Sequence, residues 1–456
     1  MKLLSIGKGM LAPLVVMTSL GCSESTSEAP NVLLYVSDTL RADSLACYGN
    51  AIVETPHLDQ LASEGVLYEQ AFAPSSWTRA SMGSILSGTM PAVHGAEGRY
   101  DLLDESVVLI SEILGSQGYD TAGITTNRNV GSFFGFDQGF EAGGFIELYE
   151  PSTKNMVMVA ELVTRADDVT RAAIDWLEQA SEPFCLIVHT IDPHSPYTPP
   201  EEWDRYGDGI ASSATGTHED LFALGKKHTQ ADVERILSLY YGEIAFNDAA
   251  IGELLDWLKQ RGMYDRTITV FTSDHGEEFW ELGERGHGKT VNEKSLHVPL
   301  LVRFPSKLEA TRTSDFVSTV DILPTILELA NAEAPEWLRG ASLVGSARKE
   351  IFASCLLGNR ELLSLRGERW KLVKNLKQNS VALYDLHQKQ GEGRDVARQH
   401  QSKARELNAR VEQLMLEHRQ ERLQLHGTKA VQEVGELPDE VDEDLRKMGY
   451  LGSDEE

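Results

Sequence analysis

Three groups of carboxylate and imidazole side chains stand where they could hold a metal ion or move a proton. They are Asp38, then His189 with Asp192 and His194, and finally Asp274 with His275. Carboxylates favour hard divalent ions, and imidazoles favour Zn²⁺ or Mn²⁺. Each group alone is a weak signal, because an aspartate after a strand is more often a helix cap. Together they predict a site, provided that the fold brings them to one place.

The segments around these groups indicate that it does. Residues 31–37, 184–190 and 267–273 are short apolar runs rich in β-branched residues, which is typical of buried strands. Further strands are predicted at 66–72, 121–125 and 297–304. Helices are predicted at 55–63, 81–86, 107–117, 166–179 and 321–330, with one or two helices over 231–261. This alternation predicts an α/β fold with a mostly parallel central sheet and helices on both faces. Ligands collect at the carboxyl ends of strands in such sheets.

The C-terminal part has a different pattern. Residues 368–386 predict short antiparallel strands, a charged helix is expected over about 402–425, and the acidic tail from 430 is expected to be irregular. We therefore expect a catalytic domain at 31–335, a small C-terminal α+β subdomain at 336–427 and an acidic tail at 428–456.

Six segments between about residue 31 and 330 form an ordered set of motifs: NVLLYVSDTLRADSLACYGN, TPHLDQLASEGVLYEQAFAPSSWTRASMGSILSG, TIDPHSPYTPP, YYGEIAFNDAAIGELLDWL, TSDHGEEFWELGERGHGKTVNEKSLHVPLLVRFP and STVDILPTILELA. In this order they resemble the sulfatase family of the alkaline phosphatase superfamily. YDL at 384–386 and GYLG at 449–452 also look like family features. The resemblance implies an alkaline-phosphatase-like fold, a metal-dependent hydrolase of sulfate esters and one divalent ion (Ca, Zn or Mn).

The resemblance also places the nucleophile. Sulfatases of the usual type carry Cys or Ser in C/S-x-P-S-R, ten residues before a helix-ending Gly. Counting back from Gly88 gives Thr78, with Met82 where the family has Arg. Thr cannot become formylglycine, and Arg79 is the nearest cation that could replace the missing one. A Thr here resembles the phosphodiesterase and phosphoethanolamine-transferase branches instead. The alternative is that Thr78 only caps the following helix.

The remaining site residues follow from the same resemblance. Asp38, Thr78, Asp274 and His275 are expected to hold the metal ion, and His194, Lys289 and His287 are expected to join Thr78 in catalysis. His194 is the candidate general acid, and Lys289 is expected to hold the ester oxygens. His189 and Asp192 are second choices for a functional role. Glu277 and Glu278 are expected to lie behind these residues or at the surface.

Three functions remain open on the sequence alone. The first is hydrolysis of sulfate esters. The second is a phosphodiester or phosphonate hydrolase, or a phosphoethanolamine-type transferase, which Thr78 and His287 favour. The third is a catalytically inactive binding protein of the cell envelope, suggested by the loss of the formylglycine precursor and of the motif Arg. The expected partner is a sulfated or phosphorylated small molecule or glycan.

Composition limits the other partners. The chain has 70 acidic and 42 basic residues and a formal net charge of −28. Such a surface repels nucleic acid and anionic membranes, so no nucleic-acid partner is expected. Apart from Cys22, the chain has three cysteines, Cys47, Cys185 and Cys355. Their odd number and wide spacing predict neither a disulfide framework nor a cysteine metal site.

The first 22 residues resemble a secretion signal, and residues 23–30 a polar tether. Lys2 and Lys8 accompany an apolar run at 10–20 that is too short to span a bilayer. The run ends in Ser-Leu-Gly-Cys at 19–22, which resembles a bacterial lipoprotein signal, although the Leu lies one place later than usual. We expect Cys22 to carry lipid, with an ordinary cleaved signal as the alternative. The expected location is the bacterial cell envelope (periplasm or outer membrane lipoprotein) or outside the cell, with membrane contact only through this anchor.

Overall fold

The computed structural model describes residues 29–149, 164–338, 340–427 and 431–448. Its centre is an eight-stranded sheet with the order β10-β2-β9-β6-β1-β5-β3-β4. Its strands are β1 (Asn31–Ser37), β2 (Val66–Phe72), β3 (Asp120–Thr125), β4 (Phe145–Glu147), β5 (Phe184–Thr190), β6 (Thr267–Ser273), β9 (Leu300–Arg303) and β10 (Thr311–Ser318). All neighbours pair in parallel except β9, which is antiparallel to β2 and β6. The predicted mostly parallel sheet is confirmed.

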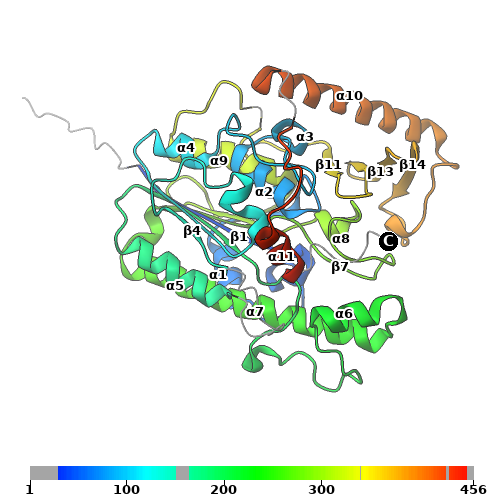
Figure 1. The fold of residues 1–456 in the computed structure, drawn as a ribbon, viewed down its shortest axis with the longest axis horizontal. Coiled ribbons are helices and arrows are strands. Elements are labelled where there is room, and N and C mark those ends of the chain that lie inside the picture. The colour runs from blue at the N-terminus through cyan, green and yellow to red at the C-terminus, as the bar shows by residue number, and fades with distance from the viewer. Residues whose placement is uncertain (1–28, 150–163, 339, 428–430, 449–456) are drawn as a thin grey trace, which may run out of the picture.

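Helices cover both faces of this sheet, as the sequence predicts (Figure 1). Successive side chains of a strand point to opposite faces. Val32, Leu34 and Val36 of β1 therefore join one core with α2 (Thr78–Ser87), α4 (Ile110–Gly115) and α9 (Ile322–Ala330). Leu33 and Tyr35 join the other with α1 (Pro56–Glu64), α5 (Ala166–Leu177) and α7 (Gln230–Gln260). The shorter helices are α3 (Pro91–His94), α6 (His218–Leu224) and α8 (Glu293–Leu296).

The strand register explains why the polar groups converge. Ser37, the last residue of β1, pairs with Thr190 of β5 and with Ser273 of β6. Asp38 and Asp274, which follow these strand ends, therefore leave the sheet at the same level. His189 pairs with Val36 on one side and with Thr125 of β3 on the other. One edge of the sheet thus receives side chains from β1, β3, β5 and β6.

The C-terminal part forms its own small sheet. Strands β11 (Ile351–Cys355), β12 (Leu362–Arg366), β13 (Trp370–Asn375) and β14 (Ser380–Asp385) pair antiparallel in that order. Helix α10 (Gln401–His426) packs on this sheet and reaches α3 (Figure 1). This confirms the expected small subdomain with strands and a helix.

The acidic tail departs from expectation. Residues Asp439–Lys447 form helix α11 rather than irregular chain. Leu437, Val441 and Leu445 are buried in the same core as α2 and α4, so this segment packs on the catalytic part of the chain. The acidic composition of this segment led to the prediction of irregular chain. Its three apolar residues recur at intervals of four, which is the spacing of one helix face.

The proposed signal, Cys22 and the tether up to residue 28 lie outside the described residues, as does the GYLG motif at 449–452. Among the helices that the structure describes, none has the length and apolar character needed to cross a membrane.

Candidate active site

Carboxylates and imidazoles meet at the carboxyl edge of the sheet. Asp38, His189 and Asp274 are buried there, and one possible ligand atom from each lies within 4.8 Å of the others. Nε2 of His275 lies 3.8 Å from Oδ1 of Asp38 and 3.5 Å from Oδ2 of Asp274. The three polar groups of the sequence are therefore brought together, with His189 rather than Asp192 as the member from β5.

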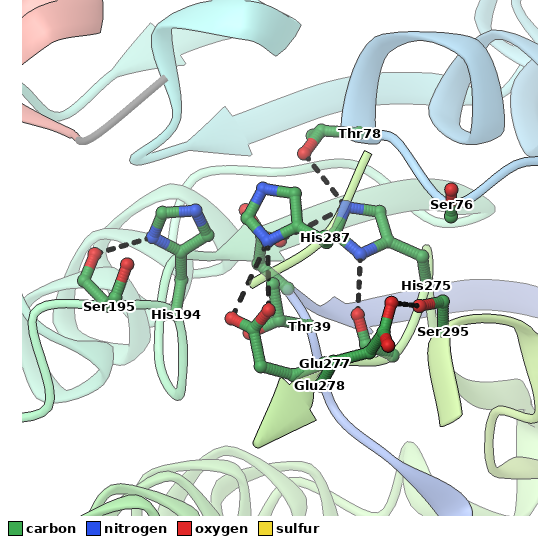
Figure 2. A network of polar contacts seen from close by, with 12 residues as sticks. Thr39, Ser76, Thr78, His194, Ser195, His275, Glu277, Glu278, His287 and Ser295 are labelled. Atoms are coloured by element: carbon green, nitrogen blue, oxygen red, sulfur yellow. Dashed lines mark hydrogen bonds and ion pairs between the residues drawn. The ribbon is translucent and has the colours of Figure 1, made fainter. Parts of the chain in front are cut away.

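Thr78 faces this cluster from the start of α2. Its Oγ1 lies 3.1 Å from Nε2 of His275 (Figure 2). Nδ1 of His275 donates a hydrogen bond of 2.9 Å to the carbonyl oxygen of Gly276. In the neutral ring, Nε2 is then the nitrogen with the free lone pair, and the Thr78 hydroxyl donates to it. The predicted nucleophile and the predicted ligand His275 thus share one hydrogen bond.

The position of Thr78 in α2 argues against the capping alternative. The N-cap residue is Trp77, and Thr78 is the first residue of the helix. The first turn of an α-helix presents N–H groups without partners inside the helix, which suits the binding of an anion. All ten residues of α2 are buried, and Gly88 ends the helix at φ 65°. The helix is therefore a rigid support for Thr78.

The donor set fits a divalent ion. Burial alone would raise the pKa of Asp274, but the imidazoles of His275 and His189 outweigh it and hold this pKa below its ordinary value. Burial lowers the pKa of His275 below its ordinary value. Oδ2 of Asp274 and Nε2 of His189 are buried without a hydrogen-bond partner among the described residues. Such atoms are costly unless something satisfies them, and a cation does so.

The backbone next to Asp38 is strained in support of this geometry. Thr39 has φ 58°, which is uncommon for a β-branched residue. Its N–H donates to Oδ1 of Asp274 at 3.2 Å, and its carbonyl accepts from the hydroxyl of Tyr240 at 2.8 Å. Strained residues of this kind persist where the surrounding structure holds them, often at functional sites.

Asn127 is a member of the site that the sequence reasoning missed. Its side-chain amide donates a hydrogen bond of 2.6 Å to Oδ2 of Asp38. Asn127 is fully buried and begins the short 3₁₀ helix η3 (Arg128–Val130), two residues after the end of β3. The same rule that selected Asp38 and Asp274, a polar residue after a buried strand, would have found it.

His287 and His194 extend the site away from Thr78. Figure 2 shows the rings of His275, His287 and His194 in a row, with centroids 4.6 Å and 4.9 Å apart. His287 lies on the segment after the hairpin of β7 (Glu278–Phe279) and β8 (Arg285–Gly286). Nδ1 of His194 donates to the carbonyl of Ser195 at 2.6 Å. Burial and the neighbouring His287 lower the pKa of His194 to about 3.

Glu277 holds His287 in place. Nδ1 of His287 donates to Oε1 of Glu277 at 3.2 Å, and the Tyr197 hydroxyl donates to Oε2 at 2.9 Å. Burial would raise the pKa of Glu277, but His287 and the other imidazoles lower it to about 2, so the carboxylate is charged. Neither Glu277 nor Glu278 is at the surface, because both are buried.

Lys289 lies on a loop that contacts Ser76, two residues before Thr78. The N–H of Gly288 donates to the carbonyl of Ser76 at 2.7 Å, and the Ser76 hydroxyl donates to the carbonyl of Thr290 at 2.6 Å. Glu278 fixes the rest of this loop by accepting from Asn292 at 2.6 Å. These contacts tie the segment that carries Lys289 to the residues just before Thr78.

Asp192 and Arg79 contact backbone groups of neighbouring elements. The carboxylate of Asp192 accepts from the N–H of Ala166 at 2.7 Å, at the start of α5. The Arg79 guanidinium donates to the carbonyls of Gly98 at 3.0 Å and Arg99 at 2.6 Å. It therefore ties α2 to the 98–101 loop, so its known contacts do not support it as a replacement for the missing cation.

The family model named Sulfatase matches residues 30–332. Among curated proteins, an N-acetylglucosamine-6-O-sulfatase of Bacteroides thetaiotaomicron is 24% identical over 73% of this chain and 74% of that protein. An Arylsulfatase K of Bos taurus is 26% identical over 73% of this chain and 68% of that protein.

Solved structures share the fold. A phosphonate monoester hydrolase of Agrobacterium radiobacter superposes with a TM-score of 0.70, covers 90% of this chain and 100% of its own, and is 24% identical. A structure in complex with its substrate D-glucosamine-2-N,6-O-disulfate superposes with a TM-score of 0.71, covers 88% of this chain and 100% of its own, and is 20% identical. These likenesses confirm the alkaline-phosphatase-like architecture.

Proposed function

Because this chain belongs to the sulfatase family, and is therefore a hydrolase of sulfuric esters, we propose that it cleaves its ester with the hydroxyl of Thr78 as nucleophile. The observation that carries this proposal is the 3.1 Å contact between Oγ1 of Thr78 and Nε2 of His275. It places the buried hydroxyl against the same nitrogen that is proposed to hold the ion, so that the ion could activate the hydroxyl by coordination.

The proposed metal ligands are Asp38, Thr78, Asp274 and His275, and the cluster adds His189 as a further donor. A divalent ion bound there would supply positive charge. This charge would lower the pKa of the Thr78 hydroxyl and would also lower the barrier to the reaction of a bound ester. A set of carboxylates with two imidazoles favours Zn²⁺ or Mn²⁺ over Ca²⁺. Two of the proposed donors, Asp274 and His189, present the buried unsatisfied atoms that support this assignment.

The chain's own residues divide the remaining work. The Thr78 hydroxyl would lose its proton to solvent when it ionises beside the proposed ion. Its oxygen then forms a bond to sulfur while the bond from sulfur to the leaving alcohol oxygen breaks. Lys289 and the N–H groups at the start of α2 hold the negative oxygens of the ester. His194 delivers a proton to the leaving oxygen. Because burial and His287 lower the pKa of His194 to about 3, this requires the bound anion to stabilise its imidazolium.

The intermediate on Thr78 determines the second half of the reaction. A Thr ester carries no second hydroxyl on its carbon, so water must attack sulfur while the Thr78 oxygen leaves. This restores the hydroxyl and releases inorganic sulfate. The same two displacements suit a phosphoryl group. Two observations therefore support the second candidate function, a phosphodiester or phosphonate hydrolase. They are the Thr at this position and the phosphonate monoester hydrolase among the similar folds.

The substrate class follows from the relatives. The curated proteins include the N-acetylglucosamine-6-O-sulfatase and an ulvan-active sulfatase of Formosa agariphila, and one similar structure holds a disulfated glucosamine. We propose a sulfated saccharide as the substrate, processed in the cell envelope after lipidation of Cys22 or outside the cell.

A side-by-side assay tests the proposal. The protein reconstituted with Zn²⁺, Mn²⁺ or Ca²⁺ is given matched 4-nitrophenyl esters (sulfate, phosphate, phosphodiester, phosphonate) and sulfated glucosamines. Release of 4-nitrophenol and of sulfate is measured. We expect sulfate release that depends on the ion. Turnover of phosphonate or phosphodiester alone would favour the second candidate. Ion binding without turnover of any of them would favour an inactive binding protein.

A further inference from the structure

The C-terminal segment contacts the active site's supports at two places. Beyond α10, residues Gln432 and Val434 run antiparallel to the loop at 100–102: the Leu102 N–H donates to the Gln432 carbonyl at 2.9 Å, and the Val434 N–H donates to the Tyr100 carbonyl at 3.0 Å. Helix α11 then packs against η3. Helix α11 therefore lies beside η3, the element whose first residues contact the side chains at the carboxyl edge of the sheet.

The first contact is an ion pair with η3. Nε of Arg128 lies 3.7 Å from Oδ2 of Asp444, and both side chains are largely buried, with 13% and 5% of their surface exposed. The Arg128 guanidinium also lies over the ring of Tyr149, 4.5 Å from its centroid. A pair this shielded from water is screened far less than a surface pair. It therefore links η3 to α11.

The neighbours of Arg128 in η3 reach both halves of the site. Asn127 donates to Oδ2 of Asp38 at 2.6 Å. Oδ1 of Asn129 accepts from Nη2 of Arg79 at 2.7 Å, and Arg79 follows Thr78 in α2. The displacement of η3 would move the partner of a proposed metal ligand and the partner of the residue beside the nucleophile.

The second contact, with the 98–101 loop, supports Arg79 from another side. The 98–101 loop, which the 432–434 segment pairs with, supplies three carbonyls to Nη1 of Arg79, those of Gly98, Arg99 and Asp101. The C-terminal segment thus contacts both elements that supply hydrogen-bond acceptors to Arg79, which are η3 and the 98–101 loop.

We infer that the C-terminal helix α11 is a positioning element of the active site, with Asp444 and Arg128 as positioning residues that act through Asn127 on Asp38 and through Asn129 on the start of α2. The inference rests on the proposed roles of Asp38 and Thr78. Partners behind metal ligands typically change metal affinity or activity by 10- to 100-fold when they are removed.

Two variants on opposite sides of the pair test this. Asp444→Asn and Arg128→Gln each remove one charge, and Arg128→Lys retains the charge. Asp442→Asn is the matched control, because Asp442 pairs with Arg446 on the same helix and does not touch η3 through that pair. The readouts are hydrogen exchange in residues 125–131, the dissociation constant for Mn²⁺, and kcat with KM.

In Asp444→Asn and Arg128→Gln we expect faster exchange in residues 125–131, about tenfold weaker Mn²⁺ binding and a fall in kcat without a matching change in KM. Arg128→Lys should recover part of each loss, and Asp442→Asn should match the parent. Parental exchange in residues 125–131, or parental Mn²⁺ affinity, in both charge-removing variants would overturn the inference. Failure of the proposed function is distinct, since it appears in the parent as an absence of ion binding or of ester turnover.

Discussion

The hydroxyl of Thr78 and Nε2 of His275 lie 3.1 Å apart, although 197 residues separate them in the chain. Thr78 comes from the first turn of a buried helix, and His275 follows a central strand. Because Nδ1 of His275 is committed to the Gly276 carbonyl, Nε2 is left to face either the hydroxyl or a shared ion. This relationship joins the proposed nucleophile to the proposed metal ligands.

Removal of a metal ligand should remove both ion and activity. We expect Asp274→Ala to lose bound metal, because its Oδ2 is buried without a hydrogen-bond partner in the described part of the chain and lies 3.5 Å from His275. His189→Ala should weaken ion binding as well. Elemental analysis of the purified proteins measures both. Asp248→Asn is the control, since that buried carboxylate accepts from N–H groups at the start of α1. Full metal occupancy in Asp274→Ala would contradict the assignment.

Lys289 should contribute binding of the ester oxygens. Hydrogen bonds to charged groups contribute about 1.5–3 kcal/mol, so Lys289→Met should lower kcat/KM by roughly 10- to 100-fold. Steady-state kinetics on the best ester measure this. Lys294→Met is the control, because Lys294 forms a partly exposed ion pair with Asp43 in the same region. Equal effects of the two substitutions would remove Lys289 from the site.

Stability should fall as the pH drops below about 6.5, in part because of His94. Burial lowers the pKa of His94 to about 3, and its Nδ1 accepts from the N–H of Ala96 at 3.1 Å. Below the unfolded-state pKa the unfolded chain binds a proton that the folded chain refuses, so the free energy of unfolding falls by at most about 1.4 kcal/mol per pH unit from this group. The loss runs from pH 6.5 down to about 3.

Urea unfolding at several pH values measures this contribution. The variant His94→Gln keeps a donor for the Ala80 carbonyl, which His94 contacts at 3.0 Å. Its free energy of unfolding should depend less steeply on pH than that of the parent between pH 6.5 and 4. Identical slopes for the two proteins would show that His94 does not contribute.

The sequence predicted the central strands well because buried parallel strands are continuous apolar runs. β1, β5 and β6 begin and end where predicted, so Asp38 and Asp274 were correctly located at the sheet edge. Strand β10 was missed because it is an edge strand with mostly exposed polar residues, which resembles a loop. The helix expected at 231–261 is a single long helix, α7.

Side-chain direction was harder to predict than strand position. His189 lies within β5, where strand register decides whether it faces Asp38, whereas Asp192 lies after the strand and faces α5. Asn127 depends on the short helix η3, which carries no apolar repeat. Helix α11 was hidden because its packing depends on three apolar residues in an acidic segment. The direction of His189 depends on tertiary contacts that local patterns do not contain. Asn127 and α11 did carry local signals, a polar residue after a buried strand and an apolar residue at every fourth position, which the sequence reasoning did not use.

The location is tested at Cys22. If Cys22 carries lipid, the mature protein begins at Cys22 and partitions into the detergent phase. Mass spectrometry of the N-terminus and phase separation measure the two properties. Cys22→Ala should give a protein that partitions into the aqueous phase, and a variant that stays fully bound to membranes would exclude this anchor.

Substitutions at Thr78 separate the two candidate reactions. Thr78→Ser should retain part of the activity, since a primary hydroxyl can make the same contact with His275. Thr78→Cys, produced together with a formylglycine-generating enzyme, should gain sulfatase activity if the pocket is built for sulfate esters. No gain, with cleavage of phosphodiesters by the parent, would favour the phosphoryl reaction.

The central claim is tested most directly by kcat/KM of Thr78→Ala at parental metal content. Loss of a general acid typically costs about 10²- to 10⁴-fold, and loss of the nucleophile should reach or exceed that range. Ser87→Ala, which removes a hydroxyl bonded to the Gly83 carbonyl at the far end of the same helix, should leave kcat/KM within a small factor of the parent. We predict a fall of at least about 10²-fold for Thr78→Ala. Parental kcat/KM for Thr78→Ala on the best substrate would contradict the assignment of Thr78 as the nucleophile.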